Sequence, residues 1–420
     1  MLVPRAVFWV LIIWAAPMVA HADSAQTYAI VHTGQSRCYD SRAPIPCPVQ
    51  RSAAFFGQDA QTSTNPARYH DNGDGTVSDL VTGLIWQKEF RRVGFAESFA
   101  DAAASRVGGQ SDWRVPTIKE LYSLMNFDGA TGHARPEQTG APPDALPYLD
   151  TSVFAFEYPR IGRFIDAQYV SSTPYLGQTM GRDKAFFGVN FADGRIKGYP
   201  QDGGPGHRGW YARYVRGNPA YGRNDFHDNG DGTITDRATG LTWSKADSGD
   251  AAFRSRLSAT ISRDGKLDWR EALAFCAGLD LAGHTDWRLP SAKELHSILD
   301  YGRAPDATQS AALDPIFQIT PITDDLGRRD WPYVWTATTH LDGPGPGVFA
   351  VYLAFGRAGG YMRPPPQLGG FTAEPILLDV HGAGAQRSSP KSGNESLLPK
   401  GAGPQGDVLR IYNYARCVRR

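Results

Sequence analysis

The feature that most constrains this chain is an internal repeat. Residues 71–88, DNGDGTVSDLVTGLIWQK, return almost unchanged as residues 228–245, DNGDGTITDRATGLTWSK. Self-similarity of this kind is typical of repeated structural units, so both copies should share one plan. Asn-Gly followed directly by Asp-Gly predicts a β-hairpin in each copy. The tryptophan that closes each run, Trp86 or Trp243, is expected to anchor a small core.

A second motif is also present twice. Residues 112–121, DWRVPTIKEL, match residues 286–295, DWRLPSAKEL. In each copy a hydroxyl residue stands three positions before a glutamate, which is the spacing of a capping box, so a helix should begin there. Glu120 and Glu294 are thereby explained by capping and are not candidate catalytic acids.

The Asp-Trp-Arg triplet of this motif carries charges of both signs. Charged side chains can remain buried when each is paired with an opposite charge. This favours a role of the triplet in stabilising the fold. The alternative is that the charges face a ligand. The residues concerned are Asp112, Arg114, Asp286 and Arg288.

Later segments match as well: 170–173 with 335–338, 189–195 with 351–357, and 211–216 with 414–419. Hairpins followed by capped helices and further strands predict an α+β fold, with a small mixed or antiparallel sheet, two helices and long surface loops in each copy. The expected organisation is a signal peptide at 1–22, a leader at 23–67, a first domain at 68–217 and a second at 223–420. The leader should pack on the first domain. Residues 363–406, rich in Pro, Gly and Ser, are expected to form a surface loop because they offer little apolar surface to bury.

The N-terminus has the pattern of an export signal. Arg5 precedes an apolar run, residues 7–16, that is too short to span a bilayer, and Ala20-His21-Ala22 supplies a cleavage site. We therefore expect an exported protein that begins at Asp23 and is periplasmic, secreted or on the cell surface. An uncleaved anchor is the alternative. No later segment is apolar enough to cross a membrane.

The four cysteines of an exported chain predict two disulfides. Cys38 and Cys47 are close enough in sequence to close a small loop. The first copy has Ala102 and Tyr214 where the second has Cys276 and Cys417, so both members of that pair are missing together, as expected for bonded partners. Other pairings remain open, because four cysteines allow three connectivities.

The acidic turns of the hairpins concentrate oxygen ligands, which Ca²⁺ prefers. Tight-turn chemistry explains the same residues without a metal, since Asp and Asn favour turns and Gly supplies positive φ. Calcium is therefore a candidate cofactor. Its candidate ligands are Asp71, Asp74, Asp79, Asp228, Asp231 and Asp236.

The order of these motifs, from DNGDGTVxD and TGLxW through DWRLP-xxKEL and WTAT to a closing RCVR, resembles the C-terminal domain family of the Legionella collagen-like adhesin. The resemblance covers most of the mature chain, twice. It implies a C-type-lectin-like fold and an exported protein, and the best-known relative is an adhesin that binds sulfated polysaccharides. The first copy departs from the pattern by lacking both domain cysteines and by having Val170 where Trp is usual.

The function predicted is a non-catalytic binding or adhesion module for a glycan or an envelope or surface protein. Acidic and basic residues balance at 43 each, so no overall field favours nucleic acid, and no nucleophile elbow, phosphate loop or metal-ligand spacing is present. Aromatic faces stack on sugars, so the candidate ligand-binding residues are Trp210, Tyr211, Trp331 and Tyr333, with domain core as the alternative. A cell-envelope enzyme or maturation factor related to the formylglycine-generating proteins is the second hypothesis. The ligand and the oligomeric state are not determined by the sequence.

Overall fold

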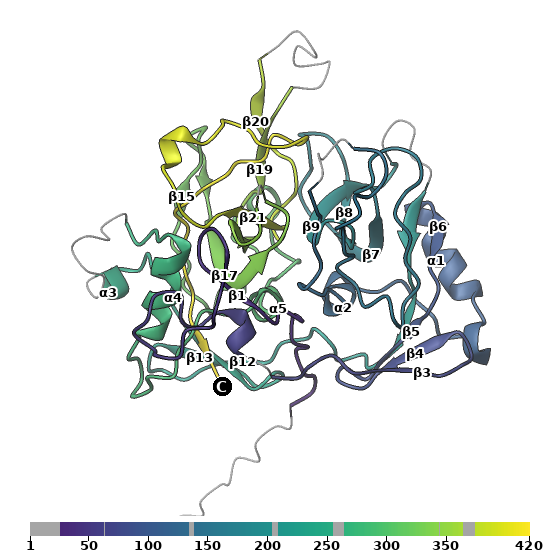
Figure 1. Ribbon diagram of the computed structural model, residues 1–420, viewed down its shortest axis with the longest axis horizontal. Helices are drawn as coiled ribbons and strands as arrows, with labels where there is room; N and C mark the ends of the chain where they lie inside the picture. The colour runs from purple at the N-terminus through teal and green to yellow at the C-terminus, as the bar shows by residue number, and fades with distance from the viewer. Residues whose placement is uncertain are drawn as a thin grey trace, which may run out of the picture.

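The structure is a computed structural model of the chain. It describes residues 26–62, 64–133, 138–203, 209–254, 264–343, 345–363 and 374–420. The predicted signal peptide lies outside these residues. Figure 1 shows the two copies side by side, the first in blue and teal and the second in green and yellow.

Each copy begins with the predicted hairpin and completes it as a four-stranded sheet. Residue 77 or 234 pairs with the tryptophan of the next strand, and both Trp86 and Trp243 are fully buried. The closing strand of each copy returns to this sheet beside that tryptophan. The strands are, in the first copy, β3 (Tyr69–Asp71), β4 (Thr76–Asp79), β5 (Leu84–Gln87) and β11 (Val215–Gly217), and in the second, β12 (Phe226–Asp228), β13 (Thr233–Asp236), β14 (Leu241–Ser244) and β22 (Val418–Arg419).

The helices begin where the capping boxes predict. Thr117 and Ser291 each accept from the amide of the glutamate three residues on, and Asp268 caps its helix through the amide of Glu271 in the same way. The helix that Asp268 caps ends at Ala277, with Gly278 as its C-cap. The helices are α1 (Phe95–Ala104), α2 (Ile118–Ser123), α3 (Ala251–Arg254), α4 (Trp269–Ala277), α5 (Ala292–Ser297) and α6 (Pro305–Thr308), with 3-10 turns η1 (Asp59–Gln61), η2 (Val107–Gly109) and η6 (Glu395–Leu397).

One eight-stranded sheet runs through both copies, which together form an α+β protein. In sheet order its strands are β17 (Tyr333–His340), β18 (Phe349–Ala354), β21 (Gln386–Pro390), β9 (Arg195–Pro200), β8 (Ala185–Asn190), β7 (Gln168–Pro174), β10 (Trp210–Ala212) and β6 (Arg91–Val93). β21 meets β9 antiparallel, with Gln386 opposite Ile196, and this pair is the seam between the copies (Figure 1).

The expectation that residues 363–406 form a surface loop is wrong for residues 376–390, which contain two strands, whereas residues 392–406 are exposed or partly exposed as expected. β20 (Ile376–Asp379) pairs with β19 (Gly359–Met362), and every residue of β21 is buried. β21 occupies beside β18 the place that β9 occupies beside β8. Its polar side chains tolerate burial because they are bonded: Gln386 accepts from Tyr122 of the first copy, and Arg387 pairs with Asp407.

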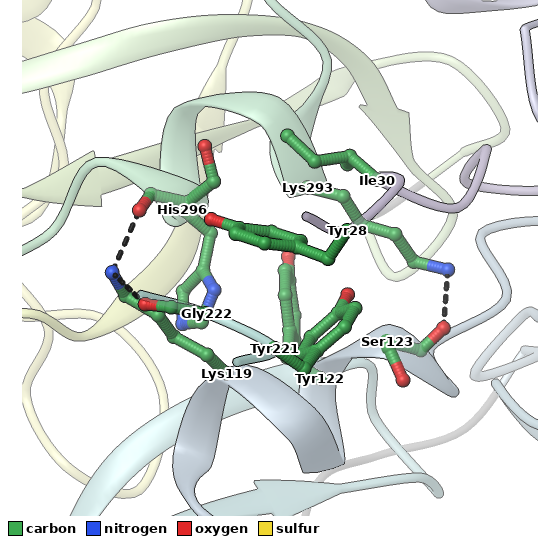
Figure 2. A pocket seen from close by; sticks show the side chains of 10 residues that line it. Tyr28, Ile30, Lys119, Tyr122, Ser123, Tyr221, Gly222, Lys293 and His296 are labelled. Carbon is green, nitrogen blue, oxygen red and sulfur yellow. Dashed lines mark hydrogen bonds between the residues drawn. The ribbon is translucent and has the colours of Figure 1, made fainter. Parts of the chain in front are cut away.

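Helices α2 and α5 pack against each other by a reciprocal contact (Figure 2). Lys119 donates from Nζ to the carbonyl of Ser297, and the equivalent Lys293 donates to the carbonyl of Ser123, each at 2.7 Å. Each of these residues has its counterpart at the same motif position of the other copy, so the copies face each other across a local pseudo-twofold axis. The tandem is therefore held together like an isologous dimer.

The leader packs mainly on the second copy, contrary to the expectation from its place in the sequence. Arg51 donates to the carbonyls of Ala277 and Trp287, and Asp59 accepts from Thr338. Its short hairpin, β1 (Cys38–Tyr39) with β2 (Pro44–Ile45), is closed by the Cys38–Cys47 disulfide. A further pair of short strands, β15 (Ile322–Thr323) and β16 (Arg329–Asp330), lies before β17.

The second disulfide joins Cys276 of α4 to Cys417, as the repeat comparison favoured. In the first copy, Tyr214 stands at the position of Cys417 and donates its hydroxyl proton to Asp101 on α1. The same helix and closing strand are thus tied by a covalent bond in one copy and by a hydrogen bond in the other. All four cysteines are bonded.

Candidate functional site

The four aromatic residues predicted to be exposed for ligand stacking are buried. Tyr211 is 1% exposed and Trp331 is 6% exposed, with Tyr333 and Trp210 between these values. Three of the four lie in buried strands of the eight-stranded sheet, called the central sheet below, and Tyr333 stacks on Tyr352 with ring centroids 4.4 Å apart. The prediction that these four residues are exposed was wrong. They belong to the domain core, which was the alternative.

The carboxylates of the acidic turns bind their own hairpins. Asp71 accepts from the Gly73 amide and pairs with Lys88 at 2.6 Å, while Asp74 accepts from both the amide and the hydroxyl of Thr76. Asp228 and Asp231 repeat these contacts in the second copy. Asp79 and Asp236 each accept from the amide two residues on. Across the described ranges no three acidic, His or Cys side chains are grouped to hold a metal ion, and calcium remains a prediction.

The charges of the Asp-Trp-Arg triplet are paired in both copies. Arg114 forms a two-point ion pair with the capping Glu120, and Arg288 does the same with Glu294. Asp112 pairs with Arg216, and Asp286 with Arg419 of the closing strand. One carboxylate thus caps the helix and neutralises the arginine, and the motif connects helix, loop and strand.

A charged pocket of about 260 Å³ lies at the seam of the central sheet. Its floor is formed by Arg195 and Lys197 of β9 and by Arg387 and Ser388 of β21, which the antiparallel pairing places next to each other. Residues 402–405 of the second copy and Phe164 of the first form walls. Both copies therefore contribute to one pocket, which neither could form alone.

Acidic side chains neutralise part of this cationic floor. Arg195 pairs with Asp342 and, at 3.1 Å, with Asp193, while Arg387 pairs with Asp407. Like charges on neighbouring strands repel, so these carboxylates are needed for β9 and β21 to lie side by side. Arg195 Nε, Arg387 Nε and Arg387 Nη1 are nevertheless buried without a hydrogen-bond acceptor among the described residues.

Burial changes the ionisation of the pocket. Desolvation, with the nearby positive charge of Arg387, lowers the pKa of Lys197 to about 7, although Lys197 donates to Gln405 at 2.7 Å. His381 lies 2.6 Å from Asp407, and burial lowers its pKa to about 4. The pKa of Asp407 is well below its usual range: burial opposes its ionisation, but Arg387 and His381 outweigh that effect. The guanidinium groups are thus the permanent positive charges of the pocket.

Sequence patterns gave little indication of these pocket residues. Arg195 was visible as the end of the repeated VNFADGR segment, but its counterpart Arg357 pairs with Asp306 and Asp330 away from the seam. Arg387 and Asp407 lie in or next to the segment that composition assigned to a loop. Only the meeting of β9 and β21 brings them together.

The fold and the pocket define a tandem-domain protein of the α+β class, with its copies joined through one sheet. The chain belongs to the Lcl C-terminal domain family, whose sequence model matches residues 75–216 and again residues 232–367. It is therefore an adhesin-like module, and its two disulfides fit an exported protein. Within the described ranges no helix is long and apolar enough to span a bilayer. No curated protein and no solved structure gives a significant match.

Proposed function

We propose that this protein is an exported, non-catalytic recognition module with C-type-lectin-like domains that binds an acidic glycan, with a sulfate or carboxylate group of the sugar in the seam pocket. The observation that carries the proposal is the pair of guanidinium groups, from Arg195 and Arg387, beside a pocket at the small end of the range for ligand sites. Guanidinium forks match the geometry of sulfate and carboxylate oxygens.

The permanent charge of the two arginines supports this assignment. Burial lowers the pKa of Lys197 to about 7, whereas a guanidinium group stays positively charged and can attract an anionic substituent throughout the neutral range. The size of the pocket suits one sugar residue or its acidic substituent rather than a longer oligosaccharide. The partly exposed Phe349 side chain at the pocket provides apolar surface for the remainder of the ring.

The second hypothesis, an envelope enzyme or maturation factor, has less support. Its thiol-dependent form requires a reactive cysteine, and all four cysteines of this chain are in disulfides. Titration of the unfolded, unreduced protein with a thiol reagent tests this point, and a free thiol would revive the hypothesis.

Binding of residues 23–420 to neutral, carboxylated and sulfated glycans, at two salt concentrations and with calcium or chelator, tests the proposal. We expect binding to acidic glycans that weakens with salt, because screening reduces attraction between charges. The Arg195→Gln variant should lose this binding. The repeat provides a matched control, since Arg357→Gln breaks an equivalent pair of ion pairs outside the pocket. Equal loss in both variants, or no binding to any acidic glycan, would refute the seam site.

A further inference from the structure

One surface has equivalent residues in the two copies but is covered in one copy and open in the other. In the second copy, the leader covers the surface formed by Arg288, Glu294 and Thr338. In the first copy, the equivalent Arg114, Glu120 and Thr173 line an open groove of about 480 Å³. The side chain of Arg114 is accordingly 38% exposed, whereas that of Arg288 is 16% exposed.

The covered site shows how the leader is bound. The Asp59 carboxylate, itself buried, accepts a hydrogen bond from the Thr338 hydroxyl at 2.5 Å. Upstream, Phe55 packs on Trp269 with ring centroids 6.1 Å apart, and Arg51 donates to the carbonyl of Trp287. An aromatic side chain, four residues before a carboxylate, thus defines the bound segment.

The open groove keeps the same recognition groups. The Thr173 hydroxyl accepts from the Ile118 amide at 3.0 Å, as the Thr338 hydroxyl accepts from the Ala292 amide at 2.9 Å. Thr338 then donates its proton to Asp59, whereas the described part of the chain gives the Thr173 proton no acceptor. Beyond the residues that line the groove, Phe95 occupies the position of Trp269. Phe95 is only partly buried, and its neighbour Phe99 is 43% exposed.

We propose that the first-copy groove binds an extended peptide segment of a partner protein, which presents an aspartate carboxylate to Thr173 and an aromatic side chain to Phe95. The leader on the second copy is the internal example of this interaction. Three cationic side chains line the groove, Arg114, Lys119 and Arg223, against the two carboxylates Glu120 and Asp300. This excess of positive charge favours an acidic occupant. A second molecule's leader is a poorer candidate, because each leader is already held on its own second copy and closed by Cys38–Cys47.

The probe is a labelled peptide of residues 36–62 with its disulfide formed, titrated into the full mature protein and followed by fluorescence anisotropy. We expect saturable binding that weakens about tenfold or more when the peptide carries Asp59→Asn, since a hydrogen bond to a charged acceptor is among the stronger ones. Thr173→Val in the protein should cause a similar loss. Thr173→Ser keeps the hydroxyl and should retain binding, which separates recognition from folding.

Three results would overturn the proposal. One is no binding of the peptide, and another is binding that is equal for wild type, Thr173→Val and the Asp59→Asn peptide. The third is concentration-dependent self-association of the protein, measured by sedimentation, that Thr173→Val abolishes, because the occupant would then be a second copy of this chain. Glycan binding at the seam involves other residues, so failure here leaves that site unaffected.

Discussion

The two copies share one plan but solve the same structural problems differently. The second copy ties α4 to its closing strand by a disulfide and buries its helix-cap motif under the leader. The first uses a tyrosine hydroxyl for the tie and leaves the same motif open to a groove. The second copy therefore has the additional stabilising contacts, the disulfide and the leader, while the first copy keeps the equivalent surface accessible.

The largest difference expected between the copies concerns the tie between helix and closing strand. The Cys276–Cys417 bond spans a sequence separation of 141, and loss of a bond that closes so long a loop should lower the free energy of unfolding by about 4 kcal/mol. Tyr214→Phe removes only the hydrogen bond to Asp101 and should cost about 1 kcal/mol. Urea unfolding of the Cys276→Ala/Cys417→Ala variant and of Tyr214→Phe measures both. Equal costs would mean that the two ties are energetically equivalent.

The next effect tests the two strand threonines, Thr338 and Thr173, that accept from the first amide of each capped helix. Thr338→Val removes the acceptor for the Ala292 amide and also the donor to the buried Asp59 carboxylate, so we expect a loss of about 2–3 kcal/mol. Thr173→Val removes only the acceptor for the Ile118 amide and should cost about 1 kcal/mol. Thermal and urea unfolding give the difference. A larger cost at Thr173 would show that its groove is less open than the leader-covered site.

How far the sequence could predict this structure follows from the kind of interaction involved. Local patterns sufficed for the hairpins and the helix starts, because Asn-Gly turns and capping boxes act within a few residues. The comparison of Ala102 and Tyr214 with their cysteine counterparts also identified the disulfide pair. Each of these predictions depends on short-range chemistry or on the repeat itself.

The seam and the leader could not be predicted in this way. β21 reads QRSSP, a polar sequence that composition assigns to a loop, and it is buried only because partners distant in sequence bond its side chains: Tyr122 binds Gln386, and Asp342 binds Ser388. The leader was assigned to its sequence neighbour, yet Arg51 and Asp59 contact the second copy. In both cases tertiary partners decide the outcome, and no local pattern reports them.

A pH-dependent effect is expected from the reciprocal lysines. Burial lowers the pKa of Lys119 to about 8 and that of Lys293 to about 7, from an ordinary value near 10.5. Between the folded and unfolded pKa values the unfolded chain binds more protons, so stability should rise with pH from about 7 to about 10.5. Met at both positions should flatten this rise. Urea unfolding at pH 7 and pH 9.5 measures how the free energy of unfolding changes with pH. If the Met variant and the wild-type protein show the same change, the two amines stay charged and well solvated in the folded protein.

The smallest effect is expected where the copies are most alike. Asp112 and Asp286 pair with Arg216 and Arg419 at 2.6 and 2.7 Å, and their side chains are 60% and 55% exposed. The arginine hydrogen bond lowers the pKa of each carboxyl, so its stabilising contribution is present above about pH 4 and is lost as the pH falls further. Because solvent screens exposed pairs, Asp112→Asn and Asp286→Asn should each change the unfolding free energy by less than about 1 kcal/mol at neutral pH, and by less still in high salt. Urea midpoints for the two variants at low and high ionic strength measure this directly. The contrary result is a cost that is several times larger at one position than at the other and that does not change with salt. It would mean that the triplet has different roles in the two copies, so that the two domains are not equivalent even in the motif that they share.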